Sequence, residues 1–300
     1  MTGRLLEKRR EKMGRVDELI AYGREHGCSD IHLTCGREPV VRCEGSLVNL
    51  SGYGNLEDAV LEEMALEILK KENRKPAGDR RLADVDVCYE AADGTRNRIH
   101  IYRQRRHTAI AIRLLCAQIP TLEELQLPPE VKRLTELSQG LVVVTGAPGS
   151  GKTTTLAACV EEINRCQRRH IITVEEPVEY LYHNKNAVIE QREVGVDVPC
   201  FADAVRSFLR EDAELLLVGE LRDGETLAAA LAAAESGRLV FAGCQIPGAA
   251  AAVEMLAGMF SSQEQQMRKK LDRQLKAVIS QSFISGENGR KTEYELLLRE

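Results

Sequence analysis

A hydrophobic run followed by a glycine-rich loop constrains the fold of this chain more than any other feature. Residues 141–144 read Leu-Val-Val-Val, which is typical of a strand buried in a parallel sheet. Residues 146–153 then match G-x-x-x-x-G-K-[ST], and a helical run continues over 154–164. A glycine turn that fits this pattern by chance is the alternative, but the position between a strand and a helix favours a phosphate-binding loop.

The residues of this loop have the chemistry that a nucleotide requires. Glycines let the backbone turn tightly and point its N–H groups inward, and the start of the next helix adds further donors. Lys152 can reach the β- and γ-phosphates, and the Thr153 hydroxyl can bind Mg²⁺. We expect ATP to be bound by Gly146, Ala147, Pro148, Gly149, Ser150, Gly151, Lys152, Thr153 and Thr154.

Composition and charge exclude several other classes of protein. The 300 residues are 43% hydrophobic and 29% charged, as in soluble globular proteins of one large domain or two ordinary ones. We find no apolar run long enough to cross a bilayer and no export signal. The 9 cysteines contain no C-x-x-C pair, which favours a reduced, cytoplasmic protein over a metal ribbon. A net charge of −5 and 4% aromatic residues argue against a nucleic-acid partner.

The first part of the chain is expected to form a small α+β domain over residues 1–115. Helical spacing predicts helices at 16–23 and 61–69, and β-rich runs predict strands at 29–34, 39–43, 46–50, 83–89, 98–102 and 108–115. Prolines between 116 and 135 indicate a linker. The basic segment 1–15 is interpreted as a solvated helix start or frayed tail rather than a membrane or partner patch.

Over residues 136–300, strands alternate with helices, which predicts an α/β domain with a parallel sheet. Buried strands are predicted at 171–174, 215–218 and 239–241, and a capping box at Ser261 predicts a long helix with the apolar stripe Met267, Leu271, Leu275 and Val278.

Acidic residues follow two of these strands: Glu175 and Glu176 follow the first, and Glu220 follows the second. Because ligands bind at the carboxyl ends of parallel strands, these acids can hold Mg²⁺ or activate water, although solvated strand-end glutamates are the alternative. Arg222 can neutralise a transferred phosphoryl group or form a structural ion pair. Likewise, the basic run 103–106 is either a solvated surface or a source of arginines for phosphates.

Several segments together resemble the PilT family, the type IV pilus retraction ATPases of the secretion-type ATPase superfamily. The resemblance covers nearly the whole chain. It rests on Cys28–Gly36 with its S-D-I-H-L core, Tyr102–Arg105, Ile119–Leu125, Ile172–Tyr180, Gln191–Gly195, Leu209–Asp212 and Leu216–Asp223.

The resemblance implies a homohexameric ring whose subunits join an N-terminal PAS-like domain to a RecA-like P-loop ATPase domain. ATP hydrolysis would drive pilus retraction and twitching motility through an inner-membrane platform protein, on the cytoplasmic side. By position, Glu175 is the water-activating acid, and Glu220 is the Walker B acid that holds Mg²⁺ together with Thr153. The arginines that approach the nucleotide from an N-terminal domain correspond to Arg98, Arg103 and Arg105.

This sequence departs from the family pattern in its histidine box. The two segments read Gly237–Val240 and Gly243–Ile246, and both family histidines are missing. Arg238 cannot act as a base, whereas Gln245 can still orient water or sense phosphate. The chain also stops soon after residues 288–290, before the C-terminal segment that the family ties to retraction. Two hypotheses follow: an active motor, or a non-hydrolysing or weakly active ATP-binding paralogue that regulates a pilus or secretion ATPase ring.

Overall fold

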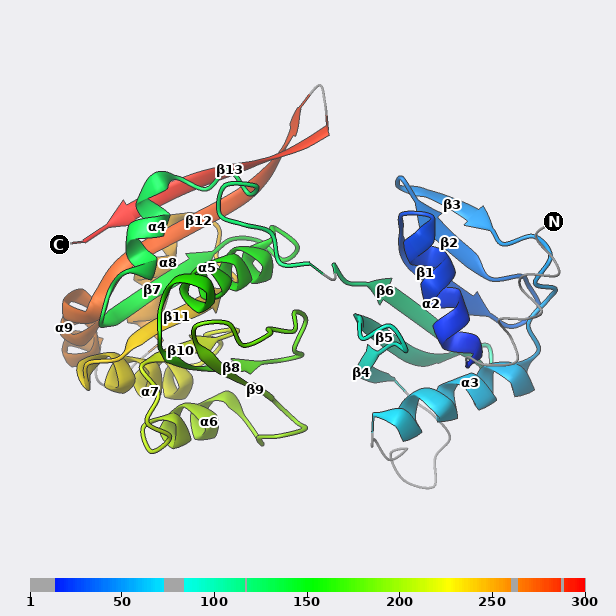
Figure 1. Cartoon of the computed structure of the whole chain (residues 1–300), viewed down its shortest axis with the longest axis horizontal. Coiled ribbons are helices and arrows are strands. Elements are labelled where there is room, and N and C mark those ends of the chain that lie inside the picture. The colour runs from blue at the N-terminus through cyan, green and yellow to red at the C-terminus, as the bar shows by residue number, and fades with distance from the viewer. Residues whose placement is uncertain (1–13, 73–83, 117, 260–263, 287–288, 300) are drawn as a thin grey trace. The chain divides into compact units, whose positions relative to one another are not determined.

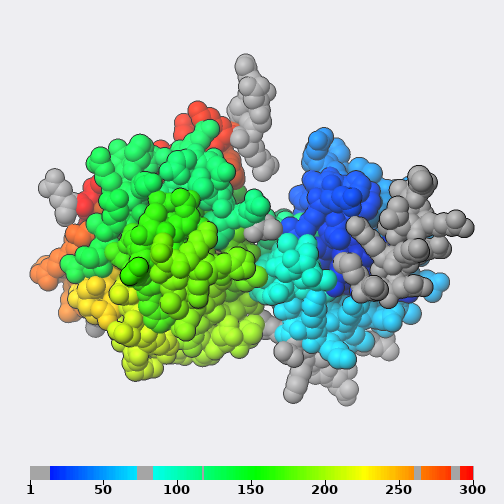
Figure 2. Space-filling model, in the orientation of Figure 1, coloured from blue at the N-terminus to red at the C-terminus, as the bar shows by residue number. Residues whose placement is uncertain are grey.

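The computed structural model describes residues 14–72, 84–116, 118–259, 264–286 and 289–299 (Figure 1). The chain divides into two units: Met1–Ala117 with Glu179–Leu181, and Gln118–Val178 with Tyr182–Glu300. Figure 2 shows the surface of the same residues, coloured from blue at the N-terminus to red at the C-terminus. The basic segment at 1–13 and the capping residue Ser261 lie outside the described residues.

An antiparallel sheet covered by helices forms the first unit, in the order β3-β2-β1-β6-β5-β4. Its strands are β1 (Cys28–Thr34), β2 (Val40–Cys43), β3 (Ser46–Asn49), β4 (Val85–Glu90), β5 (Arg96–Gln104) and β6 (His107–Leu114). Its helices are α2 (Arg15–Glu25) and α3 (Asp58–Lys71). Apolar residues of both helices, at the spacing that the sequence indicates, are buried against Ile31, Ile99 and Ile112 of the sheet. The α+β prediction for this part is confirmed.

Two cysteines of the first unit form a disulfide bond. The antiparallel register of β1 and β2 places Cys28 opposite Cys43, with their Cα atoms 4.3 Å apart. The expectation that the cysteines are reduced is therefore wrong for this pair. A sequence separation of 15 residues without a C-x-x-C pattern contains no local sign of the pairing.

A seven-stranded sheet forms the centre of the second unit, in the order β13-β12-β7-β11-β10-β8-β9. Its strands are β7 (Gly140–Thr145), β8 (His170–Glu175), β9 (Val188–Glu193), β10 (Leu215–Val218), β11 (Leu239–Cys244), β12 (Leu275–Gly286) and β13 (Gly289–Leu298). Neighbouring strands run parallel, except that β13 is antiparallel to β12. This sheet confirms the prediction of a parallel α/β domain.

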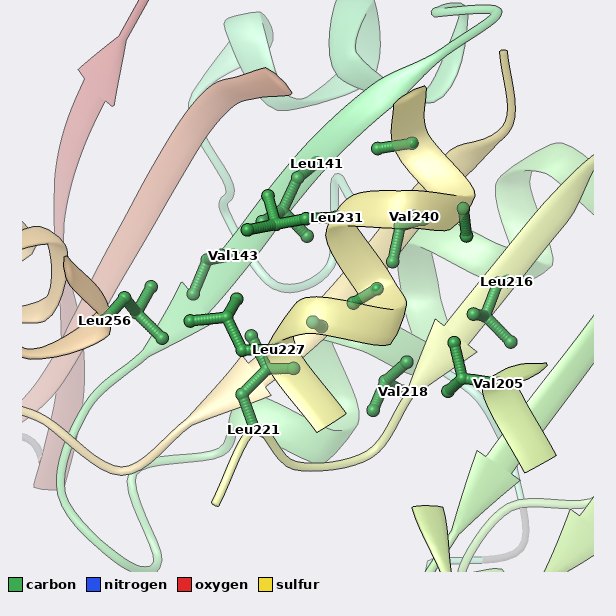
Figure 3. Close-up of a cluster of buried hydrophobic side chains, with 14 of the residues drawn as sticks. Leu141, Val143, Val205, Leu216, Val218, Leu221, Leu227, Leu231, Val240 and Leu256 are labelled. Atoms are coloured by element: carbon green, nitrogen blue, oxygen red, sulfur yellow. The ribbon is translucent and has the colours of Figure 1, made fainter. Parts of the chain in front are cut away.

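Helices cover both faces of this sheet because alternate residues of each buried strand point to opposite sides. The helices are α4 (Pro129–Thr135), α5 (Lys152–Cys166), α6 (Phe201–Phe208), α7 (Gly224–Glu235), α8 (Ala249–Gly258) and α9 (Glu264–Gln274). Leu141 and Val143 belong to the core beneath α6, α7, α8 and α9, whereas Val142 and Val144 belong to the core beneath α4 and α5. Figure 3 shows the first of these cores, with Leu227 of α7 among the strand side chains. No helix of the described residues is both long enough and apolar enough to cross a membrane.

Two expectations about this part of the chain need correction. Most of the expected linker 116–135 belongs to the second unit, because α4 forms there and Leu122 and Val131 are buried in its core. The long helix predicted through Val278 ends at Gln274. Leu275 and Val278 instead lie in β12, which pairs with the edge of β7. This sheet edge supplies hydrogen-bond partners that helical spacing in the sequence does not reveal.

Candidate active site

The predicted phosphate-binding loop connects β7 to α5 and contains glycines with positive φ angles. The φ values are 149° at Gly146, 75° at Gly149 and 91° at Gly151. A Cβ atom on Gly146 would lie 2.3 Å from the carbonyl oxygen of Gln281 and 2.6 Å from the Ser150 hydroxyl. The loop can therefore take this path only with glycine at its first position.

Lys152 lies at the first position of α5 and folds back over the loop. Its ammonium donates hydrogen bonds to the carbonyls of Gly146, at 3.0 Å, and Ala147, at 2.9 Å. Burial lowers the pKa of Lys152, and the charge of Glu220 opposes that shift. The first turn of α5 contains no acidic residue, so the partial positive charge of its N-terminus is not neutralised by a carboxylate of that turn.

Glu175 ends β8 and is held in a buried position by two side chains. It is 5% exposed, and its Oε1 accepts hydrogen bonds from the Thr173 hydroxyl at 2.8 Å and from the Gln191 amide at 3.3 Å. The amide oxygen of Gln191 accepts the Tyr182 backbone N–H at 2.9 Å, which fixes which end of the amide faces Glu175. Thr173 and Gln191 are thus functional residues beyond those predicted from the sequence. The spacing of Thr173 and Glu175, which share one face of a strand, was the available signal.

Glu220 follows β10 at the same end of the sheet. The backbone N–H of Gly219 donates to the Val174 carbonyl at 2.8 Å, which brings the ends of β10 and β8 together. A Cβ atom on Gly219 would lie 3.3 Å from the Cα atom of Glu175. The two predicted acids, Glu175 and Glu220, therefore occupy neighbouring strand ends, as the parallel order requires.

Arg222 joins the acids of these two strands. Its Nε donates to Glu220 Oε2 at 2.9 Å, and its Nη1 pairs with Glu176. Burial acts to lower the pKa of Arg222, but hydrogen bonds and charge from Glu220 and Glu176 outweigh it and raise that pKa. The guanidinium also lies 5.4 Å from the ring centroid of Phe201. Arg222 therefore forms the structural ion pair that is the alternative to a catalytic role for it.

Gln245 is exposed immediately after β11, the strand between β7 and β10. The backbone next to Gln245 is tied to the end of β7, because the Thr145 hydroxyl donates a hydrogen bond to the Ile246 carbonyl. On the other side, a Cβ atom on Gly243 would lie 2.2 Å from the Gly219 carbonyl oxygen. Gln245 therefore lies at the carboxyl end of the parallel strands, as do Lys152 and Glu220.

The arginines predicted to approach the nucleotide all belong to the first unit, whereas the loop and the acids belong to the second. Arg98 is exposed on β5, and Arg105 is exposed in the turn after it, with a φ of 48°. Arg103 forms an ion pair with Glu62 at 3.3 Å and donates to the Thr108 hydroxyl at 3.4 Å. Arg103 thus already has partners within its own unit.

The residues of the second unit fit a nucleoside triphosphate with Mg²⁺. Phosphate oxygens can replace the loop carbonyls as partners of Lys152, and the N-terminus of α5 supplies further N–H donors. The half-buried Thr153 and the partly exposed Glu220 have the oxygen ligands that Mg²⁺ prefers. When bound, the ion would neutralise phosphate charge, while the buried Glu175 carboxylate could accept a proton from water.

Comparisons with known proteins agree with this arrangement. The family model for type II/IV secretion system proteins matches residues 71–292. The type IV pilus retraction ATPase PilT of Pseudomonas aeruginosa is 35% identical over 94% of this chain and 82% of its own length. The uncharacterized protein YggR of Escherichia coli is 38% identical over 94% of this chain and 86% of its own length.

A solved structure gives the same result at the level of the fold. The crystal structure of the pilus retraction motor PilT with bound ADP superposes with a TM-score of 0.87 at 36% identity, covering 96% of this chain and 84% of that one. The RecA-like prediction is confirmed by this match and by the strand order described above. From its sequence, its fold and the residues of its phosphate-binding loop, the chain belongs to the PilT family of type II/IV secretion system ATPases.

Proposed function

We propose that this protein is an ATP-hydrolysing motor subunit that works in a hexameric ring and powers pilus retraction, the source of twitching motility. The relatives named for pilus retraction support the proposal, as does the ADP bound in the PilT crystal structure. In this proposal, residues 146–154 bind ATP, Thr153 and Glu220 hold Mg²⁺, and Glu175 activates the attacking water. Gln245 orients that water or senses the γ-phosphate.

One observation supports this function most directly: the phosphate-binding loop and the two acids Glu175 and Glu220 all lie at the carboxyl ends of the parallel strands. The charge of Glu220 acts on Lys152, while Glu175 is buried and held by hydrogen bonds from Thr173 and Gln191. A loop that only bound a phosphate compound would not need a fixed carboxylate beside it. The pairing of an anion site with a fixed acid is what hydrolysis of ATP requires.

Steady-state Mg²⁺-ATP hydrolysis by the purified protein tests this proposal. Glu220→Gln is the blank, because it should spare nucleotide binding and slow hydrolysis. Lys152→Ala should lose several kcal/mol of nucleotide affinity, since a charge-assisted contact to phosphate disappears. Turnover no greater than that of Glu220→Gln, at a concentration where rings form, would reject an active motor.

The second candidate function is a non-hydrolysing or weakly active ATP-binding subunit of a ring that contains an active paralogue. The residue at the end of β11 favours this candidate, because Gln245 occupies the place of a family histidine and is exposed there. ADP or ATP binding without turnover, rescued by mixing with an active paralogue, is the expected result for such a subunit.

Ring assembly would bring arginines to a neighbour's nucleotide. Arg98 and Arg105 are exposed and suited to this role, whereas Arg103 would first have to leave Glu62. The partner that receives the motion is a pilus platform protein of the inner membrane, with the ring at its cytoplasmic face. Turnover per subunit that stays constant on dilution through ring dissociation would contradict the need for a neighbour.

A further inference from the structure

A glutamine on β12 lies against the phosphate-binding loop and has no role in the function described so far. The parallel register of β12 and β7 pairs Ser280 with Thr145, so that Gln281 lies beside Gly146, the first residue of the loop. The Gln281 side chain is almost fully buried, at 3% exposure. Because it lies more than a hundred positions further along the chain, only the sheet brings it to the loop.

Gln281 contacts both ends of the loop. Its backbone carbonyl occupies the space that a Cβ on Gly146 would need, at 2.3 Å. Its side-chain amide donates a hydrogen bond to the Ser150 carbonyl oxygen at 2.5 Å. The same amide nitrogen would lie 3.1 Å from a Cβ on Gly151. Two glycines of the motif therefore accommodate Gln281 as well as phosphate.

The hydrogen bond from Gln281 to the Ser150 carbonyl sets the direction of a backbone N–H group that can donate a hydrogen bond to phosphate. The Ser150 carbonyl and the Gly151 N–H belong to the same peptide group, which is planar and trans, so the two bonds point in opposite directions. Holding the carbonyl toward Gln281 therefore points the Gly151 N–H away from β12. The left-handed φ of 91° at Gly151 leads from this peptide into the N-terminus of α5.

The other polar side-chain atoms of Gln281 and Ser150 lack the partners that a purely structural hydrogen bond would be expected to have around it. Among the described residues, Gln281 Oε1 and the Ser150 hydroxyl are both buried without a hydrogen bond. The unpaired Oε1 costs stability and offsets part of what the hydrogen bond to the Ser150 carbonyl contributes, so the net contribution of the Gln281 amide to the fold is small. This makes a structural role a poor explanation for a glutamine at this position.

We propose that Gln281 is a positioning residue that holds the phosphate-binding loop in its anion-binding form by fixing the Ser150–Gly151 peptide. The proposal rests on the nucleotide-binding function proposed above and assigns the geometry of that site to a residue outside the loop. Gln281 touches neither phosphate nor metal in this role, and it acts through the direction of the Gly151 N–H donor.

The test measures ADP affinity by isothermal titration calorimetry, and pyrophosphate affinity by competition, for wild type, Gln281→Met and Ser282→Ala. Methionine keeps the length of glutamine but cannot donate, and Ser282 is the exposed neighbour on the same strand. We expect Gln281→Met to weaken the affinities for ADP and pyrophosphate by the same factor, about five- to tenfold, with at most a slight drop in the urea unfolding midpoint of the nucleotide-free protein. Ser282→Ala should match wild type in both affinities.

Several results would overturn the proposal. One is wild-type ADP and pyrophosphate affinity in Gln281→Met; another is a lower unfolding midpoint with unchanged affinities, which would reveal a structural residue. If Gln281→Met does not fold, Gln281→Leu, which is apolar, uncharged and without a donor, is judged by the same two measurements. Wild-type protein that binds no ADP would reject the proposed function and this inference together. Wild type that binds ADP, with Lys152→Ala that does not and Gln281→Met that does, would reject the inference alone.

Discussion

Replacing Thr173 with valine tests the chemistry of the site by removing one hydroxyl. Thr173 is fully buried, and its hydroxyl donates to Glu175 Oε1 at 2.8 Å. Valine has nearly the same shape, so the change deletes the hydrogen bond without opening a cavity. If Glu175 activates the attacking water, its carboxylate must be held in one position, and the loss of this donor should slow hydrolysis.

The expected size of the effect follows from the type of hydrogen bond. A buried hydrogen bond to a charged acceptor contributes about 1.5–3 kcal/mol. At about 1.4 kcal/mol per factor of ten in rate, the full loss corresponds to a turnover reduced about 10- to 150-fold. The Gln191 amide, 3.3 Å from the same oxygen, would retain part of the positioning, so we expect the lower half of this range.

The assay is Mg²⁺-ATP turnover at saturating ATP, with Thr173→Ser as the matched control. Serine keeps the donor and loses one buried methyl group, which costs about 1 kcal/mol of unfolding free energy. Serine should therefore retain most of the turnover while valine does not, and both should bind ADP like wild type. Wild-type turnover in Thr173→Val would refute a fixed Glu175 carboxylate, and equal losses in both variants would assign the effect to packing.

Three further predictions follow from single side chains. Gly146→Ala should lower the free energy of unfolding by about 2–4 kcal/mol, measured by urea denaturation, because its Cβ meets the Gln281 carbonyl and its φ of 149° is strained for alanine; an unchanged midpoint would contradict this. Asp58 accepts a hydrogen bond from the Thr108 backbone N–H, which lowers the pKa of Asp58 below 3.8. The ionised Asp58 therefore stabilises the folded protein above pH 3.8, and this contribution is lost as the pH falls through the lower pKa of the folded state. Asp58→Asn should therefore flatten the acid end of the stability curve followed by circular dichroism, and a curve with the wild-type slope would argue against that role. If Gln245 senses the γ-phosphate, Gln245→Ala should reduce ATP turnover and leave ADP affinity unchanged. Wild-type ATP turnover in Gln245→Ala would contradict this role.

Local patterns in the sequence were sufficient for a large part of this structure. The run of β-branched residues before Gly146, the loop motif and the acids after two later strands all depend on neighbours in the chain, so the site's main elements could be located by residue number. The helices of the first unit were predictable for the same reason, because their apolar stripe recurs at helical spacing.

Contacts between distant segments could not be predicted in this way, and the tertiary structure alone decided them. The sheet edge of β7 turned the end of an expected helix into β12 and thereby brought Gln281 to the phosphate-binding loop. The register of β1 against β2 joined Cys28 to Cys43, and the parallel ends of β8 and β10 placed Arg222 between Glu176 and Glu220. The physical reason is that hydrogen-bond partners and charges across a sheet are chosen by strand order and register, which no short stretch of sequence contains.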